Sequence, residues 1–126
     1  MPAEPPEEPD EEDEKRLLRA IRKACELTSK GLLRCMQTCA PGRFEYELQA
    51  VLEYVFGVMG AERVGYGSIV AGGENACILH YVENEALLVD GELLLIDAAA
   101  EYRHLTADIT RTFPVNGRFS GPQRAL

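Results

Sequence analysis

Two aspartates, Asp97 and Asp108, stand where the sequence otherwise predicts strand interiors. Asp97 ends the apolar run at residues 93–96, and Asp108 opens a segment that alternates with the period of two typical of a half-buried strand. A carboxylate at such a position is unfavourable unless it is paired or bound to a metal ion. The pair therefore indicates a candidate site for a divalent cation, for which carboxylate oxygens are suitable ligands.

The spacing of the two aspartates predicts that they face each other across a hairpin. A tip at Tyr102 and Arg103 would place Asp97 directly opposite Asp108, with Cβ atoms about 4.5–5.5 Å apart. No Asn-Gly or Asp-Gly dipeptide fixes this register, and we expect a one-residue displacement of the tip to move one aspartate to the other face. The alternative is a pair of exposed charges on an edge strand, which would oppose aggregation.

Two further residues are candidates for the same site. His80 lies in a predicted strand at residues 76–81 that leads towards the aspartate hairpin. A histidine in a strand is often a structural residue, and the sequence pattern alone leaves that alternative open. Thr110 shares a strand face with Asp108 by alternation, so its hydroxyl could hydrogen-bond a ligating carboxylate. The alternative for Thr110 is an ordinary β-branched residue of a sheet.

Two amphipathic helices precede the candidate site. Apolar residues recur every three to four positions over residues 15–39 and again over residues 45–59. In the first helix this pattern places Leu17 and Leu18 on the inward face. The Ala-Pro-Gly sequence at residues 40–42 ends that helix. Both helices are expected to cover a core and to have no chemistry of their own.

Short strands follow the helices. Residues 63–70 and 76–81 are predicted strands that precede the aspartate hairpin. Ser120 followed by Pro122 predicts the start of a third helix, which reaches only to Leu126. The predicted fold class is therefore α+β, with two N-terminal amphipathic helices packed on a mostly antiparallel β-sheet and a truncated helix at the end.

Three segments resemble the catalytic domain of the creatinase/aminopeptidase P metallopeptidases. They are GGENACILHY at residues 72–81, LLLIDA at residues 93–98 and DITRTFPVNG at residues 108–117. The similarity begins at about Lys15 and continues to the last residue. It implies that residues 15–126 form the N-terminal half of a metallopeptidase domain, which is half of a pita-bread fold.

The resemblance also implies roles for the candidate residues. Asp97 would bind one metal ion, Asp108 would bridge two, and His80 would hold the scissile peptide and stabilise the tetrahedral intermediate. Carboxylate ligands suit two divalent metal ions, with Mn²⁺ favoured and Zn²⁺, Co²⁺ and Fe²⁺ as competitors. The family completes its site with a histidine and two glutamates from the second half of the domain, and no residue here corresponds to them. Ala99 stands where the family usually has glycine.

The function that the resemblance implies is a metal-dependent aminopeptidase that removes an N-terminal residue preceding proline. Its partner would be a peptide substrate with proline at the second position. With only two of the five ligands that the resemblance implies, the chain is expected to be an incomplete catalytic domain that is inactive alone. An Xaa-Pro dipeptidase of the prolidase type and a non-catalytic, peptidase-like binding module are the alternatives. An uncovered sheet face would favour self-association.

Composition limits the other possibilities. A chain of 126 residues is one modest domain, and no run approaches the ~18 apolar residues of a membrane span. Residues 1–14 contain eight of the 21 acidic residues and no base, which predicts a disordered tail with helix starting near Asp13. The remainder has 13 acidic and 13 basic residues, without a basic stripe interleaved with aromatics. Neither a nucleic-acid partner nor a membrane partner is expected.

Four cysteines are present without a Cys-x-x-Cys pair. Because the sequence also shows no signal or transit peptide, we expect reduced thiols and a cytoplasmic protein. Cys35 and Cys39 are one helical turn apart, a spacing that a metal ion could use. The alternative is that they behave as small buried hydrophobic residues.

Overall fold

The computed structural model describes residues 3–5 and 10–126 of the chain. β3 (Leu93–Tyr102) is the central strand of an antiparallel sheet, with β4 (Leu105–Pro114) along one edge. β2 (Ile69–Gly72) and β1 (Arg63–Val64) pair with successive parts of its other edge. The remaining elements are α1 (Glu11–Thr38), α2 (Glu45–Val58), the short 3₁₀ helix η1 (Gly73–Cys77) and α3 (Gly121–Ala125). The predicted α+β class is confirmed.

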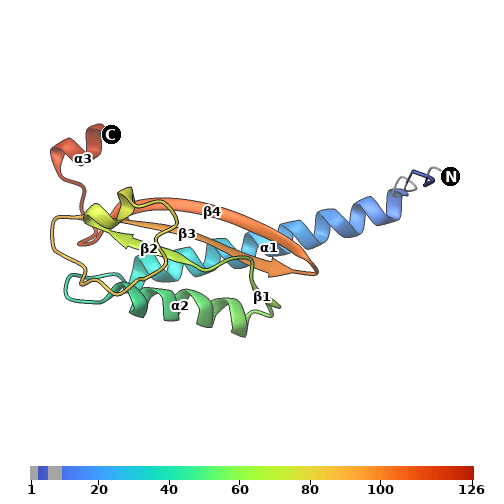
Figure 1. Ribbon diagram of the computed structural model, residues 1–126, viewed down its shortest axis with the longest axis horizontal. Coiled ribbons are helices and arrows are strands. Elements are labelled where there is room, and N and C mark those ends of the chain that lie inside the picture. Colours follow the sequence, from blue (N-terminus) through green and yellow to red (C-terminus); the bar gives the residue numbers. More distant parts are fainter. Residues whose placement is uncertain (1–2, 6–9) are drawn as a thin grey trace.

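Helices α1 and α2 pack on one face of this sheet (Figure 1). Alternate residues of β3 point into the core between sheet and helices, among them Leu94 and Ile96, which are fully buried. The two helices approach closely at Gly31, where an added Cβ would lie 2.6 Å from the Phe56 ring. Thr28, which is also fully buried, joins the helix layer to the sheet by accepting a 3.1 Å hydrogen bond from a backbone N–H of β3. The helices and strands therefore share one hydrophobic core.

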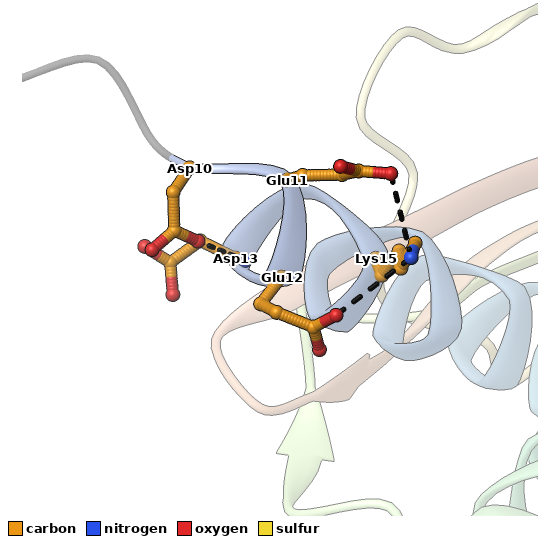
Figure 2. A network of polar contacts seen from close by, with 5 residues as sticks. All are labelled: Asp10, Glu11, Glu12, Asp13 and Lys15. Carbon is orange, nitrogen blue, oxygen red and sulfur yellow. Dashed lines mark hydrogen bonds and ion pairs between the residues drawn. The ribbon is translucent and has the colours of Figure 1, made fainter.

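Helix α1 begins at Glu11, two residues earlier than predicted. Figure 2 shows the reason: the Asp10 carboxylate accepts a 2.8 Å hydrogen bond from the backbone N–H of Asp13 and so caps the helix. Four acidic residues in the first turn are also favourable, because the N-terminus of a helix carries partial positive charge. Residues 11–14 of the expected tail are thus helical. Residues 1–2 and 6–9 lie outside the described residues, and disorder there stays a prediction.

The predicted inward face of α1 is wrong at its N-terminal end. Leu17 and Leu18 are 50% and 52% exposed, whereas Ala20, Ala24 and Leu27 are buried. Figure 1 shows that α1 extends beyond the β3–β4 turn, so no sheet lies under its first turns. A periodic pattern identifies an apolar face but cannot show where the partner of that face ends.

The predicted strand at residues 76–81 is also wrong. This segment continues from η1 into a turn, and Ile78 and Leu79 are 53% and 89% exposed. A run of apolar residues this short is equally compatible with a strand and with other structures. The fully buried Glu45 accepts hydrogen bonds from both the Asn75 amide and the Tyr81 hydroxyl, and these contacts fold the segment back on itself.

The end of the described chain agrees with its prediction. Ser120 caps α3 by accepting a 3.3 Å hydrogen bond from the backbone N–H of Gln123, and Pro122 lies in the first turn. α3 has only five residues. Within the part of the chain that the structure describes, no helix is long and apolar enough to cross a membrane.

All four cysteines are free thiols, as expected. Cys35 is fully buried between α1 and α2, and its thiol contacts the carbonyl oxygen of Leu48 at 3.4 Å. Burial, with a smaller contribution from neighbouring Cys39, raises the pKa of the Cys35 thiol to about 12. The structure supports the interpretation of Cys35 as a small hydrophobic core residue.

We expect Cys35 to resist alkylation in the folded protein. The reactive species is the thiolate, which a raised pKa makes scarce at pH 8, and the buried sulfur is also inaccessible to reagent. Iodoacetamide labelling followed by peptide mass mapping should modify the exposed Cys25 and Cys77 and leave Cys35 free until denaturant is added. Modification of Cys35 as fast as Cys25 in the folded state would contradict the packing of α1 on α2.

Candidate functional site

The β3–β4 hairpin sets the positions of the two aspartates. Asp97 pairs with Thr110, and Asp108 pairs with Ala99. The turn consists of two residues, Arg103 and His104. Both have positive φ (49° and 66°), as in the two-residue turns whose twist suits a hairpin. The predicted direct opposition of Asp97 and Asp108 is therefore wrong, because the tip lies one residue further along the chain.

The prediction that a one-residue displacement of the tip would move one aspartate to the other face of the sheet is also wrong, for a geometric reason. Moving the tip by one residue changes each cross-strand partner by two residues, and side chains repeat their direction every two residues. Asp97 and Asp108 consequently lie on the same face of the sheet as diagonal neighbours. Diagonal neighbours on adjacent strands are about 7 Å apart. This face is opposite to the one that packs on the helices, where Ile96 and Ala98 are buried.

Tyr66 joins the two carboxylates. Its hydroxyl contacts Oδ1 of Asp97 at very short range and lies 2.7 Å from Oδ1 of Asp108. Tyr66, which lies in the loop between β1 and β2, is not among the residues predicted from the sequence. Gly65 lets that loop lie flat on the sheet, since an added Cβ would be 2.3 Å from the Thr106 side chain. The glycines on both sides of Tyr66 were the only sequence indication of this close approach.

The contacts of Tyr66 show that the two carboxylates converge on one point. A phenol has one hydrogen and can donate to one carboxylate at a time, so the other carboxylate meets only oxygen lone pairs there. Burial and the hydrogen bonds to Asp97 and Asp108 raise the pKa of the Tyr66 hydroxyl and keep it protonated. Two carboxylates around one oxygen form an all-oxygen donor set, and such a set fits a hard divalent cation.

His80 lies at the same site, although it does not come from a strand. Its backbone has φ of 54°, in the turn after η1. A pocket of about 390 Å³ is lined by Tyr66, Gly67, Ile69, His80, Val82, Asp97 and Asp108. This volume is within the range of small-ligand sites. The structure thus brings together three of the four site residues predicted from the sequence, Asp97, Asp108 and His80.

Glu45, the first residue of α2, holds the loop that carries His80. Its carboxylate is fully buried and accepts four hydrogen bonds, of which those from the backbone N–H groups of Gly72 (2.7 Å) and Ala86 (2.9 Å) come from the two ends of the loop. The Asn75 amide and the Tyr81 hydroxyl donate the other two, from inside the loop. Burial and the bond to Glu45 raise the pKa of Tyr81 to about 12.

Asn84 adds a second fixed point near the end of this loop. It is fully buried, accepts a 2.9 Å hydrogen bond from the Val70 N–H and donates a 2.7 Å bond to the Ser68 carbonyl. Its φ of 48° is one that asparagine adopts more readily than most residues. Because both Glu45 and Asn84 are buried and fully hydrogen-bonded, the conformation of the His80 loop is set by the core.

The remaining sequence candidates have different outcomes. Thr110 lies directly across from Asp97, but no hydrogen bond from its hydroxyl to either aspartate is found among the described residues. The role of Thr110 as a hydrogen-bond partner of a metal-binding carboxylate stays a prediction. The Tyr66 hydroxyl makes the contacts with the aspartates that were expected of Thr110. Ala99 continues β3 without a positive φ, so alanine in place of glycine leaves the strand beside Asp97 regular.

A third protein ligand for the aspartate pair is not found in the described part of the chain. There, the one group of three potential ligand side chains is Glu62, Glu101 and His104, beside the β3–β4 turn. In this group, Glu62 already accepts a hydrogen bond from the Arg103 N–H, and Glu101 forms an ion pair with Arg63 at 3.4 Å. His104 is thus part of the turn and does not complete the site of the aspartates.

Comparison with known proteins gives the relatives of this chain. The sequence profile of metallopeptidase family M24 matches residues 19–126. The Xaa-Pro aminopeptidase of Haemophilus influenzae is 50% identical over 109 residues, which are 86% of this chain and 25% of that protein. Xaa-Pro aminopeptidase 3 of Homo sapiens is 42% identical over 103 residues, which are 82% of this chain and 20% of that protein.

Solved structures agree with the sequence relatives. Proline aminopeptidase P II from Yersinia pestis superposes with a TM-score of 0.84 at 51% identity, covering 86% of this chain and 25% of that one. A zinc-substituted Escherichia coli aminopeptidase P in complex with product gives a TM-score of 0.83 at 48% identity, covering 85% of this chain and 24% of that one. The chain spans about a quarter of the length of the curated relatives it matches. Because the family profile matches most of its length, the chain belongs to metallopeptidase family M24.

Proposed function

We propose that this chain provides the N-terminal half of the catalytic site of a metal-dependent Xaa-Pro aminopeptidase. The observation that carries the proposal is the convergence of Asp97 and Asp108 on one point in a pocket that also contains His80. The sequence relatives that are Xaa-Pro aminopeptidases support the reaction class. The proposed reaction is hydrolysis of the bond between an N-terminal residue and a following proline.

Two divalent ions are the proposed cofactors, with Mn²⁺ as the first candidate. Bound at this site, such ions would polarise a peptide carbonyl and supply hydroxide at neutral pH. Carboxylate and phenol oxygens favour Mn²⁺ over softer metals, although donor type alone does not exclude Zn²⁺, Co²⁺ or Fe²⁺. The zinc-substituted form of the E. coli relative shows that another metal can be introduced into that enzyme.

Each residue of the pocket has a proposed task. Asp97 and Asp108 would hold the cations, as carboxylate ligands that converge on one point. Tyr66 orients whichever carboxylate accepts its hydrogen and so limits the rotation of that ligand. His80, which lines the same pocket, would hydrogen-bond the carbonyl oxygen of the scissile peptide, where negative charge develops during attack.

The proposed substrate is a peptide with proline at the second position. Ile69 and Val82 contribute apolar surface to the pocket, which suits the ring of proline. Ile78 and Leu79, which precede His80 in the chain, are strongly exposed, so the loop that carries His80 presents apolar surface as well. This surface also supports the proposal that copies of the chain self-associate when no other partner covers it.

Cleavage of an Xaa-Pro-Xaa peptide tests this function. We expect no detectable turnover by the purified chain with Mn²⁺, because two aspartates leave the ions mostly hydrated, and a misplacement of about 1 Å can lower a rate ~10²-fold. Adding a separate polypeptide that contains the second half of a relative's catalytic domain should produce turnover. Asp108→Asn should remove it again, and Asp90→Asn, on the exposed turn before β3, should leave it unchanged.

The other outcomes of this experiment are also informative. Turnover by the chain alone, dependent on Asp97 and Asp108, would show that the chain forms a complete site; analytical ultracentrifugation would then show whether a homodimer forms it. Cleavage restricted to Xaa-Pro dipeptides would favour the prolidase-like alternative. If a complex with the second polypeptide forms and binds Mn²⁺ but never cleaves, the aminopeptidase proposal is wrong and the chain is a peptidase-like binding module.

A further inference from the structure

A second pocket lies between α1 and the β3–β4 turn, and cationic side chains surround it. Its volume is about 240 Å³. The lining residues are Arg16, Arg19, Ala20, Lys23, Tyr102 and Arg103. None of these residues lines the pocket that contains the aspartates.

Helical periodicity and the hairpin turn together build this pocket. Arg16, Arg19 and Lys23 are spaced by three and four residues, so they lie along one face of α1. Ala20 lies on the same face and is 6% exposed, which gives the pocket a small, closed floor. From the other side, the Arg103 guanidinium lies 5.6 Å from the centroid of the Tyr102 ring, a cation–π contact that limits its motion.

Neighbouring acids neutralise the positive charge of the pocket only in part. Lys30 and then Lys23 lower the pKa of the exposed Glu26, and Glu62 accepts a hydrogen bond from the Arg103 N–H. Arg16 pairs with Asp13 at 3.8 Å, but both side chains are more than half exposed and such a pair is weak. Over residues 3–5 and 10–126, no carboxylate lies within ion-pair distance of Arg19, Lys23 or Arg103. Like charges three or four residues apart on a helix destabilise it. A bound anion would relieve this repulsion.

The lining groups also indicate the chemistry of the anion. A guanidinium presents parallel N–H groups that match two oxygens of a phosphate, and a lysine ammonium adds a point charge. Three guanidinium groups and one ammonium exceed what a single carboxylate can use. The volume of about 240 Å³ is below the ~300–1,000 Å³ of pockets that hold drug-sized ligands, which favours a small anion over a whole nucleotide.

We propose that the pocket between α1 and the β3–β4 turn is a binding site for a small, multiply charged phosphate anion of pyrophosphate size. The site is separate from the proposed peptidase site and does not depend on that function. Attraction to the whole molecule cannot account for such binding, since the chain carries a net charge of −8. The affinity would come from the local arrangement of the four cations.

Calorimetric titration of the 126-residue chain with inorganic pyrophosphate tests the proposal. The pocket variant is Arg19→Gln with Lys23→Gln. The matched control is Arg22→Gln with Arg34→Gln, which removes the same charge from exposed positions of α1 outside the pocket. We expect the pocket variant to bind at least tenfold more weakly than the parent, the size of effect seen when a hydrogen bond to a charged group is lost. The control should bind like the parent.

Two further measurements separate the pocket from diffuse charge. Arg103→Gln, which leaves α1 unchanged, should weaken binding in the same direction. Sulfate at equal ionic strength should compete poorly, because it carries fewer charges and oxygens than pyrophosphate. The proposal is wrong if the parent does not bind pyrophosphate, if the pocket variant and the control weaken equally, or if Arg103→Gln has no effect while the chain remains folded by circular dichroism.

Discussion

Replacing either Asp97 or Asp108 by asparagine is expected to abolish detectable Mn²⁺ binding, a loss of at least about a hundredfold in affinity. Residues that only support a ligand typically change metal affinity 10–100-fold, and a ligand itself should exceed that range. Both carboxylates converge on the Tyr66 hydroxyl, so each contributes half of the negative charge at that point. Asparagine keeps the size of the side chain and removes the charge, which isolates the electrostatic contribution.

A graded series makes this prediction specific. Tyr66→Phe should weaken binding by about tenfold, because it removes only a group that orients the carboxylates. Asp90→Asn is the matched control, since Asp90 is exposed and bonds only the Asn116 amide at 2.9 Å among the described residues. His104→Asn controls for cations held beside the hairpin turn. Calorimetry or the electron paramagnetic resonance of free Mn²⁺ measures the parent and all five variants. Parent-like binding by both aspartate variants would show that the pair is not the metal site.

Replacing Glu45 by alanine is expected to lower the free energy of unfolding by about 4 kcal/mol. One buried donor, the Tyr81 hydroxyl, and three partly buried ones, including the N–H groups of Gly72 and Ala86, would lose their acceptor. A buried donor left unpaired costs ~1–3 kcal/mol, and a partly buried one costs less. Water entering the vacated space reduces the sum. The loss is a large part of the ~5–15 kcal/mol that stabilises a typical domain. Urea unfolding followed by circular dichroism measures it.

Two variants keep this prediction testable if the alanine variant does not fold. Glu45→Gln retains one acceptor oxygen and the volume of the side chain, so we expect a smaller loss, of about 1–3 kcal/mol. Glu85→Ala removes an exposed carboxylate of the same loop and should change stability by less than about 0.5 kcal/mol. In Glu45→Gln, the imidazole NMR signals of His80 should also broaden or shift, because the loop loses its anchor. Unchanged stability and unchanged His80 signals would show that Glu45 does not fix the loop.

The sequence predicted much of the site, and the physical reasons are local. The type and spacing of Asp97 and Asp108 made them candidates, and the resemblance to a metallopeptidase family favoured metal ligands over exposed charges on an edge strand. The period of two kept both aspartates on one face even though the tip of the hairpin was misplaced by one residue. His80 was identified by its neighbours in a motif, although its predicted strand was wrong. The motif and the period of two therefore identified these three residues although the predicted hairpin tip and the predicted strand of His80 were wrong.

Other parts of the site depend on residues far apart in the chain. Tyr66 is 31 residues from Asp97, and Glu45 is 36 residues from Tyr81, so no short pattern connects them. Glu45 looks like an ordinary acidic residue at a helix start. Its burial follows only from the packing of α2 against β2 and the loop after it. The same reason explains why no sequence pattern indicated the pocket between α1 and the β3–β4 turn. That pocket needs a helix face and a hairpin turn that are about 80 residues apart in sequence.

The sequence by itself determined the α+β class, the two helices, the hairpin and the two aspartates on one of its faces. These features follow from residue type and from periods of two and 3.6 residues, which act over a few neighbours. Only the tertiary structure decided the register of the hairpin, the turn that carries His80, the contacts of Tyr66 and the buried position of Glu45. Each of these depends on which distant groups satisfy a buried hydrogen bond or fill the core, and that choice is made only when the whole chain packs.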